Sequence, residues 1–364
     1  MILSDIARLR LCNQQLLRPS LTTPAEVVRW FGAVQSQDLA SSVFAIGLRM
    51  RDASEALVER SIADRSIVRS WPMRRTIHCM PAEDARWMIR MLAPRQIARM
   101  APYHRRMGID DKDLKRAGKV IHSALTRERQ LARSELYRKL NTAGIATDGP
   151  ANQMRGMHIL VHWAQAGLIC IAPRRAKQQM FGLLEEWTPA GRNLSGDEAL
   201  AELAKRYFQS HGPATVKDFA WWAGLKMIEA KRALQSIAGL LHSVRLGQNE
   251  YWLMRDAPGA GARATPVLLL PAFDEYTVAY ADRSVAADKA VLASVNHGLS
   301  ANIVIDGRIA GTWKRTLSGS GGVVVTSDLL RSLSSKERIG LTKAVERYAE
   351  FLGRTPSSGQ QRQK

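Results

Sequence analysis

Two glutamines, two residues apart, are the first side chains in this sequence whose type and spacing suggest chemistry. Gln35 and Gln37 flank Ser36 in AVQSQD, after an expected apolar helix. Where a helix unwinds, two amides at this spacing face one cavity with both donors and acceptors, which suits them to hold a water molecule. Capping of the helix end is the alternative. We interpret Asp38 as a cap or ion-pair partner in preference to a catalytic base.

A second motif, RRTIHCM (74–80), is typical of a strand. Its alternation places Thr76 and His78 on one face and Ile77 and Cys79 on the other. A hairpin with one exposed histidine is the alternative interpretation. An imidazole with a pKa near ~6.5 is able to contact a phosphate or to assist a water molecule, and the sequence leaves both roles open.

Other kinds of site are disfavoured. His158 and His162 have the i, i+4 spacing of two metal ligands, but we expect no third ligand nearby, so ordinary helix packing is favoured. LSGSGGVVV (317–325) leads into a strand and lacks the Lys-Ser/Thr of a phosphate loop, which predicts a hairpin turn. A GxSxG elbow for a serine hydrolase is absent from the sequence. We therefore expect neither a metal nor a cofactor.

The charge balance predicts a polyanionic partner. The chain has 53 Lys and Arg against 33 Asp and Glu, a net charge of +20. The excess belongs to folded segments, because residues 51–150 alone hold 21 basic and 12 acidic side chains. Nucleic acid is the usual soluble polyanion, and a solubilising surface is the alternative. The expected phosphate contacts are Arg74, Arg75, Arg174, Arg175, Lys177, Lys314 and Arg315.

Composition indicates a soluble globular protein of several domains. The chain has 364 residues, of which 46% are hydrophobic and 24% charged, with no apolar run long enough for a membrane span. Its three cysteines are far apart and odd in number, which suits a reducing compartment. Charges within the first ten residues argue against a signal peptide. We expect a cytoplasmic, nucleoid-associated monomer without a membrane partner.

Helix signals dominate the chain up to about residue 240, and short strand pairs interrupt them. Expected helices begin at Ser4, at Thr23-Pro24 and near residue 54, and the strand pair VRSWPMRRTIHCM follows. This order is typical of a winged helix-turn-helix. It recurs with a helix capped by Ser134 and with strands around Arg174 to Lys177. A third copy is expected from 215 to 254.

The chain changes character after the Gly/Ala/Pro-rich stretch 256–266. Alternating apolar residues in VLLLPAFDEYTVAY and ANIVIDGRIAGTWKRT predict strands, with Asp306-Gly307 as a hairpin turn. A closing helix then turns Ile339, Val345, Tyr348 and Phe351 inward. The predicted class is α+β, with tandem winged helix-turn-helix units and a small C-terminal β-barrel-like module. The expected segments are 1–125, 126–195, 196–256, 266–352 and a disordered tail, 353–364.

The order of QSQD, SWPMRRTIHCMPAEDARWM, PAFDEYTVAYADR and ANIVIDGRIAGTWKR closely resembles the winged-helix DNA glycosylases of the AlkZ/AlkX group. The resemblance covers residues 1 to about 352. The family's catalytic Gln-x-Gln matches Gln35 and Gln37, and its Thr-x-His matches Thr76 and His78. The central residue of the first motif is usually apolar in the family, whereas this chain has Ser36, which is able to compete for the water if it faces inward.

The resemblance implies a monofunctional enzyme that hydrolyses the N-glycosidic bond of N7-alkylated guanine in double-stranded DNA and that unhooks interstrand crosslinks. Alkylation at N7 leaves the base cationic and therefore a good leaving group, so positioning of the water by glutamine suffices. No lysine lies beside the Gln pair for Schiff-base chemistry. A non-catalytic winged-helix DNA-binding protein or transcriptional regulator is the alternative. The sequence leaves open which lesion is removed.

Overall fold

The computed structural model describes residues 2–147, 154–188, 191–257, 267–319, 321–357 and 361–363. Its internal contacts divide the chain into two compact units. Unit 1 contains Met1–Arg60 and Leu200–Lys364, and unit 2 contains Ser61–Ala199. These units do not follow the five expected segments, because the expected first segment is divided after Arg60. The expected boundary at 256–266 lies almost wholly outside the described residues.

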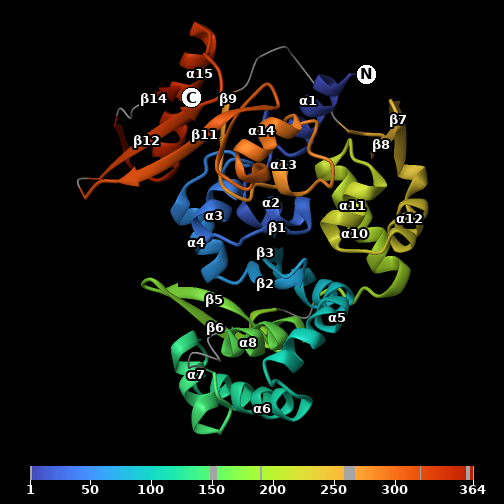
Figure 1. Ribbon diagram of the computed structural model, residues 1–364, viewed down its shortest axis with the longest axis vertical. Coiled ribbons are helices and arrows are strands. Elements are labelled where there is room, and N and C mark those ends of the chain that lie inside the picture. Colours follow the sequence, from blue (N-terminus) through green and yellow to red (C-terminus); the bar gives the residue numbers. More distant parts are fainter. Residues whose placement is uncertain are drawn as a thin grey trace. The chain divides into compact units, whose positions relative to one another are not determined.

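The helices of unit 1 come from both of its chain segments (Figure 1). They are α1 (Leu3–Asn13), α2 (Pro24–Phe31), α3 (Leu39–Gly47), α4 (Glu55–Ala63), α10 (Gly196–His211), α11 (Val216–Ala223), α12 (Met227–Ser236), α13 (Glu275–Val278), α14 (Lys289–Ser294) and α15 (Ser335–Phe351); α4 and α10 cross the unit boundaries. Among the described residues, no helix combines the length and apolar character that crossing a lipid bilayer requires.

Helix starts follow the sequence signals in part. Thr23 caps α2 as predicted, because its side chain accepts a hydrogen bond from the backbone N–H of Glu26. The caps predicted at Ser4 and Ser134 are wrong, since Ile2 and Ala132 precede the first turns of α1 and α7 (Arg133–Thr142). In both helices a carboxylate in the first turn accepts from the N–H of the preceding residue, and this bond fixes the start.

Helix α3 directly follows the Gln-Ser-Gln motif and is not among the helices expected from the sequence. Leu39 and every residue from Ser42 to Gly47 are buried, so the helix shows no amphipathic period. The ring of Phe44 packs against those of Tyr348 and Phe351, with centroids 4.5 and 5.3 Å away. Burial on nearly all sides therefore holds α3 in the core of unit 1.

A mostly antiparallel sheet forms the C-terminal part of unit 1. Strands β9 (Val267–Leu270), β10 (Asn302–Ile305), β11 (Arg308–Leu317), β12 (Gly322–Leu329) and β13 (Thr355–Ser357) pair in the order β13-β12-β11-β10-β9, and β14 (Gln361–Gln363) also pairs with β12. The predicted turns at Asp306-Gly307 and within 317–325 join its strands. Two short strands of the expected tail, β13 and β14, pair parallel to β12. Barrel closure stays a prediction.

The closing helix α15 packs on β9 and differs in one contact from its prediction. Tyr348 and Phe351 are buried as predicted, and Val345 is half-buried. Ile339 is 59% exposed, and Leu341 occupies the inward position of that turn instead. The apolar stripe of α15 therefore starts later than the pattern of large residues indicates.

A separate hairpin in unit 1 follows α11 and α12. Its strands β7 (Leu241–Leu246) and β8 (Asn249–Met254) pair antiparallel along their full lengths. Helix, helix and hairpin thus occur in the order expected of the third repeat. The winged-helix interpretation of this repeat stays a prediction.

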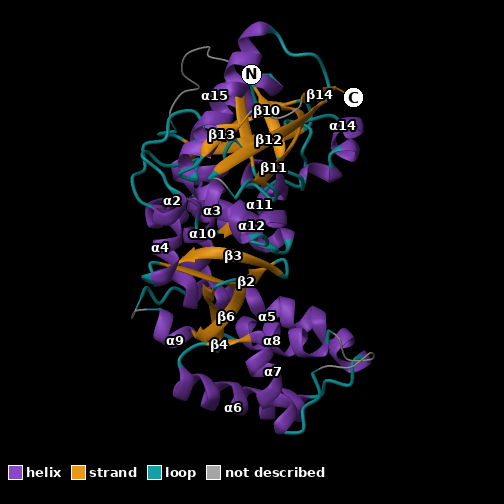
Figure 2. Cartoon of the chain, turned by 90° about the vertical axis from the view of Figure 1, so that its left-hand side faces the viewer, coloured by secondary structure: helices purple, strands orange, loops and turns teal. Residues whose placement is uncertain are grey.

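Unit 2 combines a sheet with helices packed beside it (Figure 2). Its helices besides α7 are α5 (Ala82–Arg106), α6 (Asp111–Glu128), α8 (Arg155–Gln165) and α9 (Leu184–Trp187), and its strands are β2 (Ile67–Met73), β3 (Thr76–Pro81), β4 (Leu131–Ala132), β5 (Ile169–Arg175) and β6 (Gln178–Leu183). Within the unit the strands follow the order β3-β2-β5-β6-β4. The two predicted hairpins, β2–β3 and β5–β6, therefore share one sheet, joined where Arg69 pairs with Ile171.

Three histidines gather between α5 and α8. The ring of His104 lies 5.6 Å from that of His158 and 5.8 Å from that of His162, so the premise that no third histidine is near the pair is wrong. Within the described ranges, no group of three His, Cys, Asp or Glu is arranged to hold a metal. Burial, and then the two neighbouring imidazoles, lower the pKa of His104 to about 4.

Lowering the pH from 7 to 5 is expected to destabilise the chain through this histidine cluster. Folded His104 stays neutral down to pH about 4, whereas the unfolded side chain takes up a proton near 6.5, so the unfolded state binds more protons in between. The stabilisation is complete above pH 6.5 and is lost as the pH falls toward 4. Urea unfolding midpoints across this range measure it. His104→Phe should flatten the dependence, and replacement of the exposed His122 by Gln should not.

Candidate active site

The first motif lies in unit 1, in the short connection between α2 and α3. Gly32 ends α2 with a φ of 76°, and β1 (Val34–Gln35) carries the chain toward α3. Asp38 is the N-cap of α3, since its carboxylate accepts from the N–H of Ser41 at 2.7 Å. The predicted capping role of Asp38 is confirmed. Two helix ends thus fix the segment from Gln35 to Gln37, called the QSQ segment below.

Side chains of the QSQ segment have different surroundings. Gln35 is 7% exposed and Ser36 is fully buried, whereas Gln37 is exposed. Ser36 Oγ lies 2.7 Å from Ser42 Oγ, and because Ser42 donates to the carbonyl of Leu39, Ser36 is the donor in this pair. The Ser36 hydroxyl is therefore directed at the first turns of α3.

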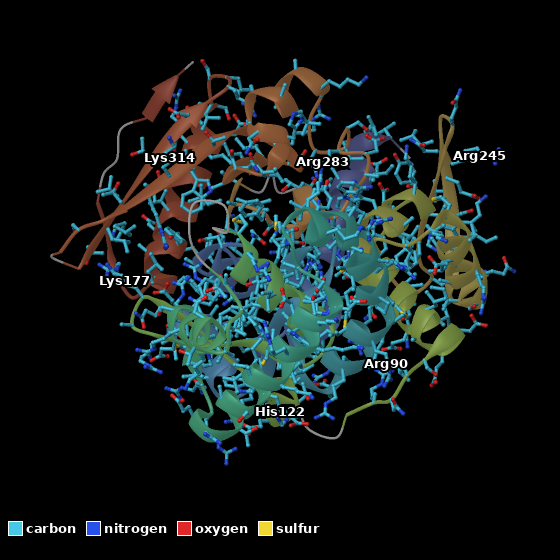
Figure 3. All side chains as sticks on the ribbon, turned by 60° about the horizontal axis from the view of Figure 1, so that its bottom comes forward. Arg90, His122, Lys177, Arg245, Arg283 and Lys314 are labelled. Carbon is cyan, nitrogen blue, oxygen red and sulfur yellow. The ribbon has the colours of Figure 1, made fainter. Side chains whose placement is uncertain are left out.

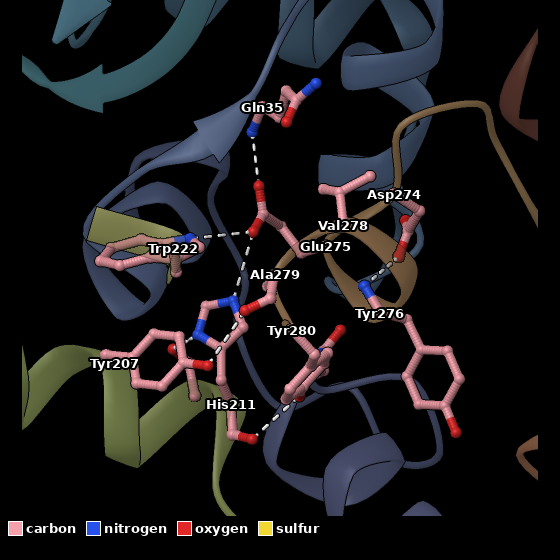
Figure 4. A network of polar contacts seen from close by, with 12 residues as sticks. Gln35, Tyr207, His211, Trp222, Asp274, Glu275, Tyr276, Val278, Ala279 and Tyr280 are labelled. Carbon is pink, nitrogen blue, oxygen red and sulfur yellow. Dashed lines mark hydrogen bonds and ion pairs between the residues drawn. The ribbon is translucent and has the colours of Figure 1, made fainter. Parts of the chain in front are cut away.

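A buried carboxylate contacts the backbone of the QSQ segment. The N–H of Gln35 donates to Glu275 Oε1 at 2.6 Å, while the side chain of Gln35 extends away from Glu275 (Figure 4). Oε2 of the same carboxylate accepts from Trp222 Nε1 at 3.1 Å and lies 3.3 Å from His211 Nε2. The segment PAFDEYTVAY, which contains Glu275, carries a family resemblance in the sequence but no local signal that assigns a role to Glu275.

The residue before Glu275 forms a buried ion pair. Asp274 accepts two hydrogen bonds from Arg49, at 2.7 and 2.8 Å, and neither side chain is exposed. Asp274 also caps α13 by accepting from the N–H of Tyr276. The strand predicted through VLLLPAFDEYTVAY therefore ends at Leu270, because Asp274 starts a helix.

Two of the predicted DNA contacts lie close to the QSQ segment within unit 1. A cavity of about 120 Å³ is lined by Asp38 and Ser41 from the start of α3 and by Lys314 and Arg315 from β11. Lys314 is exposed (Figure 3), and Arg315 donates to Tyr348 Oη at 2.5 Å. Positive charge is thus adjacent to the motif.

The second motif lies in unit 2, on the hairpin β2–β3. Arg74 and Arg75 form its turn, both with φ in the left-handed region, at 51° and 59°. His78 is fully buried, contrary to the expectation of an exposed histidine. Its Nε2 lies 3.2 Å from Arg74 Nη2 and its Nδ1 lies 3.0 Å from the carbonyl of Thr76. Because a guanidinium only donates and a carbonyl only accepts, His78 is neutral with its proton on Nδ1.

Two hydroxyl groups complete this face of the hairpin. Ser70 pairs directly with His78 across the strands, so its side chain points to the same face as those of Thr76 and His78. Ser70 Oγ and Thr76 Oγ1 are both buried, with no hydrogen-bond partner in the part of the chain that the structure describes. Sequence reasoning missed Ser70, which only the strand register reveals.

The remaining basic residues surround the second hairpin of unit 2. Arg174, Arg175 and Lys177 are exposed at the turn between β5 and β6, where Lys177 is visible in Figure 3. Arg175 forms an ion pair with Glu135 at 3.4 Å. Unit 2 thus contains Arg74, Arg75, Thr76 and His78 as well as Arg174, Arg175 and Lys177. Unit 1 contains Gln35, Gln37, Lys314 and Arg315.

Comparison with known proteins decides the family. The family model for DNA glycosylase AlkZ-like proteins matches residues 28–351, which include both motifs. The chain belongs to the AlkZ-like DNA glycosylase family. It is accordingly a monofunctional DNA glycosylase, an enzyme that hydrolyses N-glycosidic bonds without cleaving the abasic site.

Two relatives extend this result. The interstrand DNA cross-link repair glycosylase of Streptomyces sahachiroi is 24% identical over 360 residues, which cover 94% of this chain and 93% of that protein. The solved structure of the Streptomyces sahachiroi DNA glycosylase AlkZ matches with a TM-score of 0.80 at 22% identity, over 98% of each chain. This chain therefore has the fold of that AlkZ-like structure.

Ser36→Ala is expected to leave base excision within about twofold of the wild-type rate, because the Ser36 hydroxyl is directed at Ser42. Ser42 keeps its own bond to Leu39, so the loss of stability should be about 1 kcal/mol. Single-turnover excision and thermal unfolding measure the two effects. A rate loss above tenfold would show that Ser36 does contact the reacting water.

Proposed function

We propose that this AlkZ-like glycosylase removes N7-alkylated guanine from double-stranded DNA and that Gln35 and Gln37 position the attacking water. The observation that carries the proposal is the QSQ segment: its backbone is fixed, its central side chain is turned away, and the Gln37 side chain is exposed immediately before α3. An amide binds a water molecule through both a donor and an acceptor.

The reaction needs little acid catalysis on such a base. Water forms a bond to C1′ through its oxygen, the C1′–N9 bond breaks, and its electron pair neutralises the cationic purine while the water proton leaves to solvent. The carbonyl dipoles of the glutamines favour the positive charge that develops at C1′. Positioning of the water beneath C1′ then supplies the rate.

The β2–β3 hairpin has a different role in this proposal. His78 is neutral, and its two ring nitrogens contact Arg74 and the Thr76 carbonyl. Such a histidine orients the Arg74 guanidinium toward a DNA phosphate more readily than it accepts a proton from water. A regulator that only binds DNA would not need Gln35 and Gln37 to position a water molecule.

Interstrand crosslinks are a second substrate class in this proposal. The Streptomyces sahachiroi relative is named for the repair of such crosslinks, and the alignment covers 94% of this chain. A crosslink at guanine N7 has the same cationic leaving group as a monoadduct. An unhooking assay beside a monoadduct assay separates the two substrates. Release of the monoadduct alone would limit the enzyme to lesions that are attached to one strand of the duplex.

Gln37→Ala is expected to lower the single-turnover excision of N7-methylguanine by about 10- to 100-fold, with DNA affinity within a few-fold, because only water positioning is lost. Duplex oligonucleotides with one N7-methylguanine measure both the rate and the affinity. Parallel losses of binding and rate would assign Gln37 to DNA docking. Gln15→Ala, at a buried glutamine outside the motif, is the control for replacing an amide.

Replacing Arg74 and Arg75 together by Ala is expected to flatten the salt dependence of DNA affinity. Each phosphate contact removed should reduce the slope of log affinity against log salt concentration by about 0.9. Arg331→Ala is the matched control, because Glu337 already neutralises Arg331 through two hydrogen bonds of 2.7 and 3.0 Å. An unchanged slope in the double variant would remove Arg74 and Arg75 from the DNA interface.

A further inference from the structure

Glu275 is the one acidic side chain among the described residues recorded as bonded to the backbone of Gln35, and it is fully buried. Its two oxygens are engaged separately. Oε1 accepts the N–H of Gln35, and Oε2 accepts the indole N–H of Trp222. Both of these groups only donate, which is the environment of an ionised carboxylate.

A rigid surround holds the Glu275 carboxylate. The ring of His211, whose Nε2 lies 3.3 Å from Oε2, stacks on Tyr207 with centroids 4.7 Å apart and an interplanar angle of 12°. The carbonyl of His211 accepts from Tyr280 Oη at 2.8 Å, and Tyr207 Oη donates to the carbonyl of Ala279 at 3.0 Å (Figure 4). Ala279 and Tyr280, which directly follow α13, are thereby attached to α10, so the carboxylate has little freedom to move.

This arrangement sets the position of the QSQ segment. Gln35 lies between the end of α2 at Phe31 and the start of α3 at Leu39, so its N–H is not bonded within a helix. Loss of the Glu275 carboxylate removes the 2.6 Å bond to this N–H, and the segment is expected to shift. Gln37, two residues further on, would move with it.

We propose that Glu275 is a positioning residue of the glycosylase: its carboxylate holds the Gln35 backbone so that both glutamines are aimed at the reacting water. Glu275 itself does not touch the substrate. This inference rests on the proposed role of Gln35 and Gln37, and it adds a charged group distant in sequence to a motif of two neutral amides.

The test is Glu275→Gln, which keeps the size of the side chain but replaces one of the two carboxylate oxygens that accept from Gln35 and Trp222 by an N–H₂ group. The matched control is Asp218→Asn. Asp218 is another fully buried carboxylate of unit 1, it accepts the backbone N–H groups of Ala281 and Asp282, and no contact recorded for it involves the QSQ segment. Asp218 also lies 3.7 Å from the guanidinium of the buried Arg10, so Asp218→Asn should lower the unfolding temperature at least as much as Glu275→Gln does.

Glu275→Gln is expected to slow single-turnover excision of N7-methylguanine by about tenfold or more, with DNA affinity within about threefold. Asp218→Asn should retain the wild-type rate within about twofold when assayed well below both unfolding temperatures. Adding Glu275→Gln to Gln37→Ala should cost at most about another twofold, because both changes disturb the same water. Equal rate losses in Glu275→Gln and Asp218→Asn, or additive losses in the double variant, would overturn the proposal in favour of a purely structural role.

A second measurement does not depend on the substrate. The amide proton of Gln35, bonded to a carboxylate at 2.6 Å, should resonate far downfield and exchange slowly in the wild type. Both signatures should be lost in Glu275→Gln and kept in Asp218→Asn. An unchanged Gln35 resonance in Glu275→Gln would overturn the proposal. If the wild type leaves N7-methylguanine in the duplex, the proposed substrate fails, and the Gln35 resonance decides the role of Glu275 on its own.

Discussion

The buried ion pair between Arg49 and Asp274 is the constraint on which the arrangement of the first motif depends. Both side chains are fully enclosed, and removal of either partner would leave an uncompensated charge, a loss of about 3–5 kcal/mol. Arg49 lies just beyond the end of α3 and also donates to the carbonyl of Ala45. The pair therefore fixes the C-terminal end of the helix whose N-terminal end follows the QSQ segment.

Asp274 and Glu275 are neighbours in sequence, and each holds one end of the same stretch of chain. Asp274 binds Arg49 after α3, and Glu275 binds the N–H of Gln35 before it. The stretch from Gln35 to Arg49 is thus held at both ends by residues that lie more than two hundred positions later in the sequence. Two adjacent carboxylates are buried here because each accepts hydrogen bonds from its own donors.

Local signals in the sequence predict a large part of the fold. The cap at Thr23, the turn at Asp306-Gly307 and the hairpins of unit 2 depend on residues within a few positions of one another, and each is confirmed. The missed helix α3 has no local signal, because burial on nearly all sides removes the amphipathic period. The strands after residue 353 depend on pairing with β12 and carry no strong pattern of their own.

For the candidate site, the sequence likewise predicts the residues but not their contacts. Spacing and the family resemblance select Gln35, Gln37, Thr76 and His78, but they do not give the surroundings of these side chains. The buried state of His78 follows from the register of β2 against β3 and from Arg74 in the turn. The contact of Glu275 with the QSQ segment joins positions 240 residues apart, and one sequence holds no signal for such a pairing.

Under the proposed function the substrate base is itself cationic, and the charges near the motifs fit such a substrate. The side chains of the two motifs, Gln35, Gln37, Thr76 and His78, are neutral, and the proposed mechanism needs none of them to protonate the leaving group. Asp274 and Glu275 carry formal negative charge near the first motif and are buried, whereas Asp38 is exposed and caps α3. Lys314 and Lys177 are exposed, and under the proposed function their positive charge attracts DNA phosphates without acting on the bond that breaks. An ordinary guanine lacks the positive charge at N7 and is a poorer leaving group, so under the proposed mechanism a site that only positions water leaves undamaged DNA intact.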